Sequence, residues 1–322
     1  MSINQEQATW FADAFDRLVE NVDQAVVGKK RVIRLALASL FSQGHMLLED
    51  VPGTGKTVLA KAIARTIEGS SSRIQFTPDL LPSDVTGITI YDQKKGEFEF
   101  HPGPIFASIV LADEINRASP KTQSALLEVM EEGFVTIDGV RHEVPRPFMV
   151  IATQNPVEQA GTYKLPEAQL DRFLMKTSLG YPDHQTTVKL LMEASNRQRA
   201  NLVEPILETD TVVMMQELAA QVHVEASIME YIAQLVQATR SERDIVVGVS
   251  TRGALALARA AKTWAISQGR GFVIPDDVRE LAVPVLAHRL VIDPEVEFRG
   301  TSAEDIVERI LIDIAPPQYR AA

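Results

Sequence analysis

A glycine-rich turn between an apolar run and a helical pattern carries the residues best suited to bind phosphate. The apolar run that begins at Met46 predicts a strand, and Lys56 and Thr57 open a helix. The turn between them can point successive backbone N–H groups at a polyphosphate, and the helix adds the positive end of its dipole. By position, the Lys56 ammonium reaches the outer phosphates and the Thr57 hydroxyl coordinates Mg²⁺. The predicted nucleotide contacts are Pro52, Gly53, Thr54, Gly55, Lys56, Thr57 and Val58.

One position departs from the general formula for such a loop, G-x-x-x-x-G-K-[ST]. Its first glycine would fall at residue 50, where the chain has Asp50. An alternative interpretation is a surface turn before an ordinary helix, which accounts for Pro52 and Gly53. It does not account for Lys56 and Thr57 at the point where a strand feeds a helix. We therefore predict a nucleotide site in spite of Asp50.

Two acidic residues end the next long apolar run. Residues 106–112 predict a strand buried on both faces, and Asp113 and Glu114 follow it. Open α/β sheets bind ligands at the carboxyl ends of their strands. We predict that Asp113 holds the Mg²⁺ shell and that Glu114 orients and deprotonates an attacking water. The alternative is a pair of solvated acids at a helix start, and the upstream loop favours the catalytic interpretation.

Three further polar residues could complete such a site. Asn155 follows another buried run, 148–153, and its amide can bind the attacking water or the γ-phosphate, although Asn before proline is also a common turn former. Arg172 follows a short predicted helix and is either a structural ion pair with Glu167 or Asp171 or a finger for a neighbour's nucleotide. Arg252 opens a later helix and could fold over the nucleotide or make a salt bridge.

The first 42 residues predict two amphipathic helices, at 5–22 and 30–42. Apolar residues at helical spacing in the first helix are expected to pack on the core: Trp10, Phe11, Ala14, Leu18 and Val22. Val27 and Gly28 lie between the two helices, shortly before the phosphate-binding strand. Residues in that place often wall an adenine and are as often plain core, so both interpretations stay open.

Composition and charge bound the class of protein. The 322 residues are 45% apolar, which suits a sizeable core and suggests two domains. A net charge of −11 and a pI near 5.1 argue against nonspecific nucleic-acid binding. The chain has no Cys, which excludes disulfides and thiolate metal sites. With no basic leader and no apolar run near the ~18 residues of a membrane helix, we expect a cytoplasmic protein without a transmembrane segment.

The order of the predicted elements divides the chain at residue 182. Residues 1–182 alternate strands and helices, which favours an α/β nucleotide-binding core. Two β-hairpins interrupt it, at 88–101 and 134–144. Residues 183–322 show no further strand runs and predict a small all-helical domain. Its expected helices cover residues 184–199, 209–222, 225–240, 252–268, 276–289 and 302–314.

The hairpins are expected to carry the output of the protein, because the sheet needs no extra strands there. Phe98 and Phe100 fall on one face of the first hairpin. We expect both rings to dock on the protein's own core and the turn around Lys94 and Lys95 to face a partner.

Five motifs follow one another along the chain: Pro-Gly-Thr-Gly-Lys-Thr (52–57), Asp-Glu-Ile-Asn-Arg-Ala (113–118), Ala-Thr-Gln-Asn-Pro (152–156), Leu-Asp-Arg-Phe (170–173) and Ser-Thr-Arg (250–252). Taken in order, they resemble the motifs of the MoxR family of AAA+ ATPases over nearly the whole chain. The resemblance implies a P-loop AAA+ core with a C-terminal helical lid domain, and ATP and Mg²⁺ as cofactors. It implies these roles: Gly53 to Thr57 as Walker A, Asp113 and Glu114 as Walker B, Asn155 as sensor 1, Arg172 as arginine finger and Arg252 as sensor 2.

The same resemblance implies a function and partners. Members of this family assemble as rings of six and act as chaperone-like remodellers, often with partners that carry a von Willebrand factor A domain. We therefore expect ATP hydrolysis that remodels protein partners, without nucleic acid. The alternative is an ATPase subunit of a metal-chelatase-like or nucleic-acid-processing complex. A GTPase is disfavoured because no Asn-Lys-x-Asp guanine motif is present.

Overall fold

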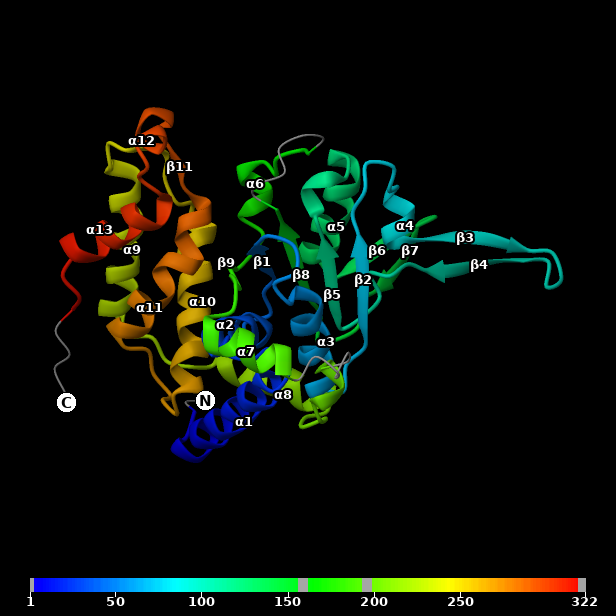
Figure 1. Ribbon diagram of the computed structural model, residues 1–322, viewed down its shortest axis with the longest axis horizontal. Coiled ribbons are helices and arrows are strands. Elements are labelled where there is room, and N and C mark those ends of the chain that lie inside the picture. Colours follow the sequence, from blue (N-terminus) through cyan, green and yellow to red (C-terminus); the bar gives the residue numbers. More distant parts are fainter. Residues whose placement is uncertain (1–2, 156–161, 193–198, 318–322) are drawn as a thin grey trace. The chain divides into compact units, whose positions relative to one another are not determined.

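The computed structural model describes residues 3–155, 162–192 and 199–317, and its contacts divide the chain into two compact units (Figure 1). The α/β unit consists of Arg17–Leu165 and Thr177–Val213. The helical unit consists of Met1–Asp16, Pro166–Lys176 and Met214–Ala322. The domain boundary expected after residue 182 remains a prediction.

A five-stranded sheet of order β2-β5-β8-β1-β9 forms the core of the α/β architecture. The strands are β1 (Met46–Glu49), β2 (Ser71–Gln75), β5 (Ile109–Asp113), β8 (Met149–Gln154) and β9 (Met175–Thr177). β2 pairs with β5, β5 with β8 and β8 with β1, all in parallel. Every residue of β5 is buried, as its continuous apolar run predicted. The parallel pairing brings the carboxyl ends of β1, β5 and β8 to one edge of the sheet.

The helices of the α/β unit that bury apolar residues are α2 (Lys30–Phe41), α3 (Lys56–Thr66), α4 (Pro82–Thr86) and α5 (Pro120–Glu132). Helix α7 (His184–Met192) follows β9 and has no buried residue. Short 3₁₀ turns lie at Ile115–Arg117 and Arg199–Leu202. α5 begins as predicted after Ser119, whose hydroxyl accepts a hydrogen bond from the backbone of Thr122. It ends at Gly133, where φ is 72°. Residues 193–198, within the helix expected at 184–199, lie outside the described residues.

Both predicted hairpins are present and antiparallel. They are β3 (Gly87–Asp92) with β4 (Glu97–Pro102), and β6 (Phe134–Ile137) with β7 (Val140–Glu143). The Asp138-Gly139 turn has φ values of 51° and 79°, which fits the two-residue turn expected of Asp-Gly. In Figure 1 the β3–β4 hairpin projects well away from the sheet.

The two phenylalanines of the first hairpin have different environments. The Phe100 ring stacks on His142 of the second hairpin, 3.9 Å between centroids, and packs edge-on against Phe106. Its predicted docking is confirmed. Phe98 is 75% exposed, so the expectation that it docks on the core was wrong. The Phe98 ring contacts Tyr91 on the opposite strand. This pair lies nearer the hairpin tip than Phe100, beyond the reach of Phe106 and His142, which cover the Phe100 ring.

The helical unit is built mainly from four long helices. They are α9 (Ala226–Ser241), α10 (Thr251–Ser267), α11 (Pro275–Leu286) and α13 (Ala303–Asp313), with short helices α6 (Glu167–Leu170) and α12 (Pro294–Phe298) and a 3₁₀ turn at Ala287–Arg289. α13 has the predicted capping box, because Ser302 and Asp305 each bind the other's backbone N–H. The C-terminal region is therefore helical, as expected.

One detail of the helical prediction was wrong. Two short strands, β10 (Ile245–Val247) and β11 (Val291–Ile292), form an antiparallel pair in this unit. Neither is long enough to show a period of two in the sequence, so alternation could not reveal them.

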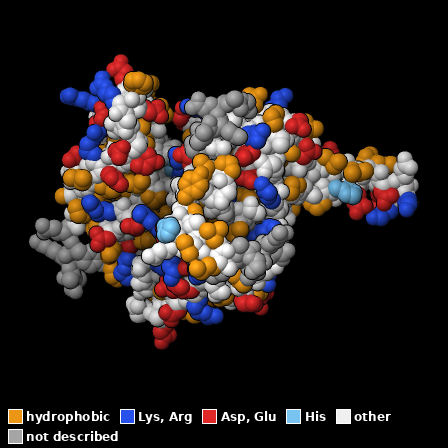
Figure 2. Space-filling view, viewed as in Figure 1, with side chains coloured by type: hydrophobic (Ala, Val, Ile, Leu, Met, Phe, Trp, Pro, Cys, Tyr) orange, Lys and Arg blue, Asp and Glu red, His pale blue; other side chains and the backbone are white. Residues whose placement is uncertain are grey.

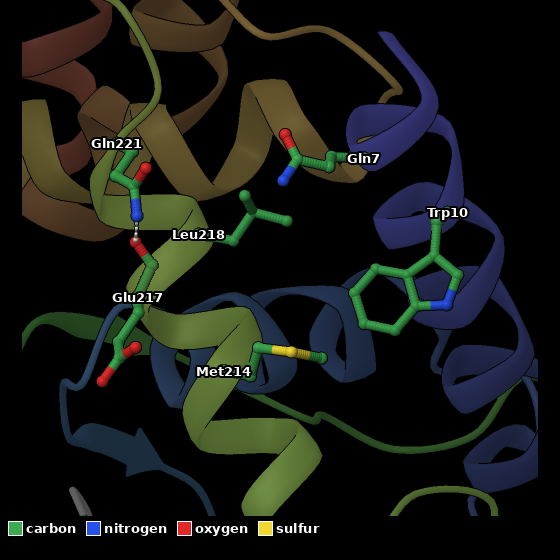
Figure 3. Close-up of a pocket in the computed structure, with 6 residues that line it drawn as sticks. All are labelled: Gln7, Trp10, Met214, Glu217, Leu218 and Gln221. Atoms are coloured by element: carbon green, nitrogen blue, oxygen red, sulfur yellow. Dashed lines mark hydrogen bonds between the residues drawn. The ribbon is translucent and has the colours of Figure 1, made fainter. Parts of the chain in front are cut away.

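Helix α1 (Gln5–Asp23) and helix α8 (Thr209–Ala220) border a small pocket. Phe11, Leu18 and Val22 are fully buried as predicted, but Trp10 is 40% exposed. Its indole instead lines a pocket of about 400 Å³ that lies wholly within the helical unit (Figure 3). The pocket is lined by Gln7, Trp10, Met214, Glu217, Leu218 and Gln221.

Among the described helices, α1 included, none has the length and apolar character needed to cross a bilayer.

Candidate active site

The glycine-rich loop connects the end of β1 to the start of α3. Gly53 and Gly55 adopt φ values of 86° and 99°, which only glycine adopts without strain. A Cβ added at either residue would meet nothing within 4 Å, so the space beside the loop is open to a ligand. The Lys56 side chain is folded over the loop, and its Nζ donates to the carbonyl oxygens of Asp50 and Val51 at 3.2 Å each. The loop therefore has the open, N–H-rich geometry that phosphate requires.

Asp50, the departure from the general formula, anchors this loop. It is 3% exposed, and its carboxylate accepts three hydrogen bonds from one downstream segment. The donors are the Ser178 hydroxyl at 2.8 Å, the Leu179 N–H at 2.7 Å and the Gly180 N–H at 2.8 Å. Hydrogen bonds to a charged group contribute about 1.5–3 kcal/mol each. Asp50 thus fixes the start of the loop to residues 178–180, a contact that a glycine could not make.

Asp113 lies at the carboxyl end of β5 and is held on both oxygens. The buried Thr153 hydroxyl donates to its Oδ1 at 2.7 Å, and Arg73 Nη2 donates to its Oδ2 at 2.6 Å. The Thr153 Oγ also accepts the backbone N–H of Glu114 at 2.8 Å. A single hydroxyl on β8 therefore fixes both predicted acidic residues.

Glu114 has a strained backbone, with φ 57° and ψ 49° in the left-handed region. A left-handed backbone is uncommon in a non-glycine residue, although Gln43, Glu68 and Asp138 of this chain also adopt one. Its carboxylate Oε2 accepts hydrogen bonds from the Gln75 amide at 2.8 Å and from Arg117 Nη1 at 3.1 Å. The unusual conformation turns the chain sharply after β5, and the two donors hold the carboxylate at the sheet edge.

Asn155 directly follows β8, between the loop and the acidic pair. β8 pairs with β1 on one side and with β5 on the other. The backbone N–H of Asp50 donates to the Gln154 carbonyl at 3.1 Å, which extends this pairing to the start of the loop. Asn155 is 8% exposed. The structure therefore brings the loop, the acidic pair and Asn155 to one edge, and residues 156–161 lie outside the described residues.

The donor set at this edge suits Mg²⁺. Thr57 supplies a hydroxyl oxygen and Asp113 a carboxylate, the hard oxygen ligands that Mg²⁺ prefers. Within the described parts of the chain, no cluster of three or more His, Cys, Asp or Glu forms a metal site. Mg²⁺ at nucleotide sites is held by one or two protein ligands together with substrate phosphates, so two protein oxygens beside a phosphate loop fit it.

Val27 and Gly28 lie between α1 and α2. Val27 is half-buried and Gly28 is exposed. A Cβ on Gly28 would lie 3.1 Å from the Thr186 hydroxyl in α7, and Gly28 adopts a φ of 76°. The neighbouring Lys29 donates from Nζ to the Tyr181 carbonyl at 2.9 Å. Gly28 and Lys29 therefore lie close to the segment that follows residues 178–180, while Val27 has only its partial burial to place it.

The two predicted arginines belong to the helical unit. Arg172 is the second residue after α6, and Arg252 is the second residue of α10. Asp171 and Ser250, just before them, are joined by a hydrogen bond of 3.0 Å between the Ser250 hydroxyl and the Asp171 carboxylate. Asp171 makes an ion pair with Arg289, at 2.6 Å.

Sequence inspection missed several residues that hold this site, namely Asp50 as an anchor, Arg73, Gln75, Arg117 and Thr153. Thr153 left a signal, because it is the polar residue that ends the otherwise apolar run 148–153. Arg73 and Gln75 are two residues apart on β2, and side chains at that spacing lie on the same face of a strand. The sequence near Asp50 gave no signal of its hydrogen-bond partners, because they lie 128 to 130 residues away.

Comparison with known proteins agrees with this geometry. Residues 45–175 match the model of the ATPase family associated with various cellular activities (AAA), and residues 237–310 match the AAA lid domain. The chain is 49% identical to an uncharacterised protein, YeaC, of Bacillus subtilis (strain 168), over 95% of this chain and 96% of the relative. It is 41% identical to Chaperone MoxR1 of Mycobacterium tuberculosis, over 95% of this chain and 83% of the relative.

A solved structure shares the whole fold. The crystal structure of a candidate ATPase from Cytophaga hutchinsonii superposes with a TM-score of 0.90 at 40% identity, and the match covers 97% of this chain and 98% of that one. Protein MoxR of Methylorubrum extorquens is 30% identical over 96% of both chains. With this similarity along its full length, the chain belongs to the MoxR family of AAA+ ATPases.

Proposed function

We propose that this ATPase hydrolyses ATP with Mg²⁺ and uses the energy to remodel protein partners in a chaperone-like manner. The observation that carries the proposal is the shared sheet edge, where neighbouring strands deliver Lys56, the Asp113–Glu114 pair and Asn155. The relative named Chaperone MoxR1 supports the remodelling role.

In this proposal each residue has a stated task. The Walker A residues Gly53 to Thr57 bind the phosphates through backbone N–H groups and the Lys56 ammonium. Bound Mg²⁺ supplies charge neutralisation at the phosphates, with Thr57 and Asp113 as its protein ligands. Glu114 accepts a proton from the attacking water, and Asn155 orients that water.

The two arginines and the residues near α2 complete the proposed site. Arg172 acts as a finger on a neighbour's nucleotide and Arg252 as sensor 2, because guanidinium stays charged and spreads donors over several phosphate oxygens. Val27 and Gly28 border the adenine. A finger that acts between subunits requires an oligomer, and we propose a ring, with six subunits by analogy with the family. Cytoplasmic location and partners with a von Willebrand factor A domain rest on the same analogy.

A direct assay tests the catalytic part of the proposal. Phosphate release should require both ATP and Mg²⁺, and chelation with EDTA should reduce it to background because the phosphate charge is no longer neutralised. Restoring Mg²⁺ in excess of EDTA serves as the control for irreversible damage. Release that continues at an unchanged rate without divalent cations would rule the proposed chemistry out.

The β3–β4 hairpin is the surface we propose for partner contact. Its exposed apolar side chains lie on both faces: Ile88 and Ile90 on one, Tyr91 and Phe98 on the other. At the hairpin tip, Lys95 forms a surface ion pair with Glu99, with 3.0 Å between Nζ and Oε2. Figure 2 shows acidic and basic side chains together at this tip, beyond hydrophobic ones along the hairpin. Apolar area held out in solvent on a two-stranded hairpin is typical of an interaction site.

A matched pair of substitutions tests this surface. Phe98→Ser should leave the melting temperature and basal ATP hydrolysis near those of the native chain, because the ring is exposed. It should weaken ATP-dependent suppression of aggregation of a heat-unfolded test protein. Phe100→Ser is the control, since it removes the stack on His142 and should lower the melting temperature. If the Phe98→Ser protein suppresses aggregation as well as the native chain does, the surface that contacts partners lies outside this hairpin face.

A further inference from the structure

In the helical unit, an ion pair between Arg289 and Asp171 holds the segment that contains Arg172. Arg289 is 6% exposed, and its Nε donates to the Asp171 carboxylate at 2.6 Å. Its Nη2 donates to the carbonyl oxygens of Asp171, at 3.3 Å, and of Phe173, at 2.7 Å. Its Nη1 donates to the Leu174 carbonyl at 3.3 Å. One guanidinium therefore fixes the backbone on both sides of Arg172.

The same pair contacts the first turn of α10, which carries Arg252. The Ser250 hydroxyl, at the N-cap of α10, donates to the second carboxylate oxygen of Asp171 at 3.0 Å. A Cβ on Gly253 would lie 2.9 Å from Cδ of Arg289 and 2.4 Å from a methyl group of Val249, so only glycine allows this approach. Arg252 lies between these two contacts. Both arginine-bearing segments are thus fastened to Asp171 and Arg289.

Charge explains why the carboxylate is needed. Burial lowers the pKa of Arg289, the Asp171 carboxylate opposes this, and the cations Arg259 and Arg252 lower it further. Arg252 and Arg289 therefore repel each other across a poorly solvated region, and Asp171 offsets the repulsion. Removal of one member of a buried ion pair leaves the other charge uncompensated, which is costly. Without the Asp171 charge, the repulsion between Arg252 and Arg289 is no longer offset.

We propose that Asp171 and Arg289 are positioning residues that hold Arg172 and Arg252 as one element, so that both arginines approach or leave nucleotide together. This inference rests on the roles proposed above for the two arginines. The consequence is coupling between the nucleotide sites of neighbouring subunits. Nucleotide that binds Arg252 also positions Arg172, which contacts the neighbour's nucleotide. Loss of the pair is therefore expected to change nucleotide affinity through Arg252 and turnover through Arg172.

The test is Asp171→Asn in the full chain, which keeps the size of the side chain and removes its charge. ATP turnover at saturating nucleotide should fall about 10- to 100-fold, as expected when a catalytic group is displaced by roughly an ångström. The Kd for ATP should rise, as in Arg252→Ala. Adding Arg172→Ala to Asp171→Asn should reduce turnover far less than Arg172→Ala does in the native chain, because residues that act as a unit are not additive.

Two further variants keep the outcome clear. Ser250→Asp preserves an N-cap residue but places a second carboxylate against Asp171, so it breaks the link without removing the ion pair. It should reproduce both effects in a folded protein. Arg270→Lys is the matched control, because it disrupts a comparable two-fold contact in the same unit, between Arg270 and Asp277. It should lower the melting temperature and leave turnover and ATP affinity unchanged.

The results separate this inference from the proposed function. Native turnover in both Asp171→Asn and Ser250→Asp, beside an impaired Arg172→Ala, would overturn the inference alone. Additive losses on combining Asp171→Asn with Arg172→Ala would overturn it too, since the pair would then have only a structural role. Full activity of Arg172→Ala would overturn the proposed finger and this inference with it.

Discussion

The Glu114→Gln protein is expected to bind ATP as tightly as the native chain and to turn it over at least about 100-fold more slowly, the usual effect of losing a general base. Glutamine has nearly the shape of glutamate, so the turn at Glu114 and its hydrogen bond to Thr153 are preserved. What is lost is the capacity to accept a proton. Binding of a fluorescent ATP analogue and phosphate release measure the two properties separately.

Lys56→Ala gives the contrasting result. The substitution removes the ammonium that would contact phosphate and also its hydrogen bonds to the Asp50 and Val51 carbonyls. Nucleotide binding itself should therefore be lost. Glu128→Gln, on the exposed face of α5, is the control for removal of a surface carboxylate and should have native turnover. Equal turnover in native and Glu114→Gln protein would refute the assignment of the base.

Arg172→Ala is expected to bind ATP nearly normally and to hydrolyse it about 10³-fold more slowly, as is typical when an arginine finger is removed. If the finger serves a neighbour, the specific activity of the native protein also rises steeply with protein concentration, because assembly completes the site. Arg299→Ala removes an exposed arginine whose surface ion pair with Glu295 contributes little, and it should have native activity.

Mixing two inactive proteins tests action between subunits directly. Arg172→Ala subunits retain an intact nucleotide loop, and Lys56→Ala subunits retain an intact Arg172. A mixed assembly contains interfaces where the second kind of subunit serves the first, so part of the activity should return. If mixtures stay inactive although the two proteins co-assemble, Arg172 acts within its own subunit or not at all.

Local patterns were enough to predict the elements that end at the site. The apolar run before Asp113 predicted a buried strand, and the glycines before Lys56 predicted a tight loop, because period and turn chemistry act over a few residues. The family motifs added the order of these elements. Both hairpins followed from alternation around a turn.

Contacts between residues far apart in sequence could not be predicted in this way. Asp171 and Arg289 are 118 residues apart, and nothing near either indicates the other. The exposure of Phe98 depends on how far the hairpin extends past its neighbours, which a period of two does not encode. The same holds for Trp10, because helical spacing identifies a face but not its edge.

The anchoring of Asp50 has a consequence for how the chain folds during synthesis. When synthesis has reached residue 175, the glycine-rich loop and strands β1, β2, β5 and β8 have been made, but the donors at residues 178–180 are not yet available to Asp50. Burying an unpaired carboxylate costs several kcal/mol, so the loop cannot settle at that stage. It reaches its final shape only after residue 180 emerges. Nucleotide can then stabilise the nascent core only late in translation, when the segment that leads into α7 has already docked.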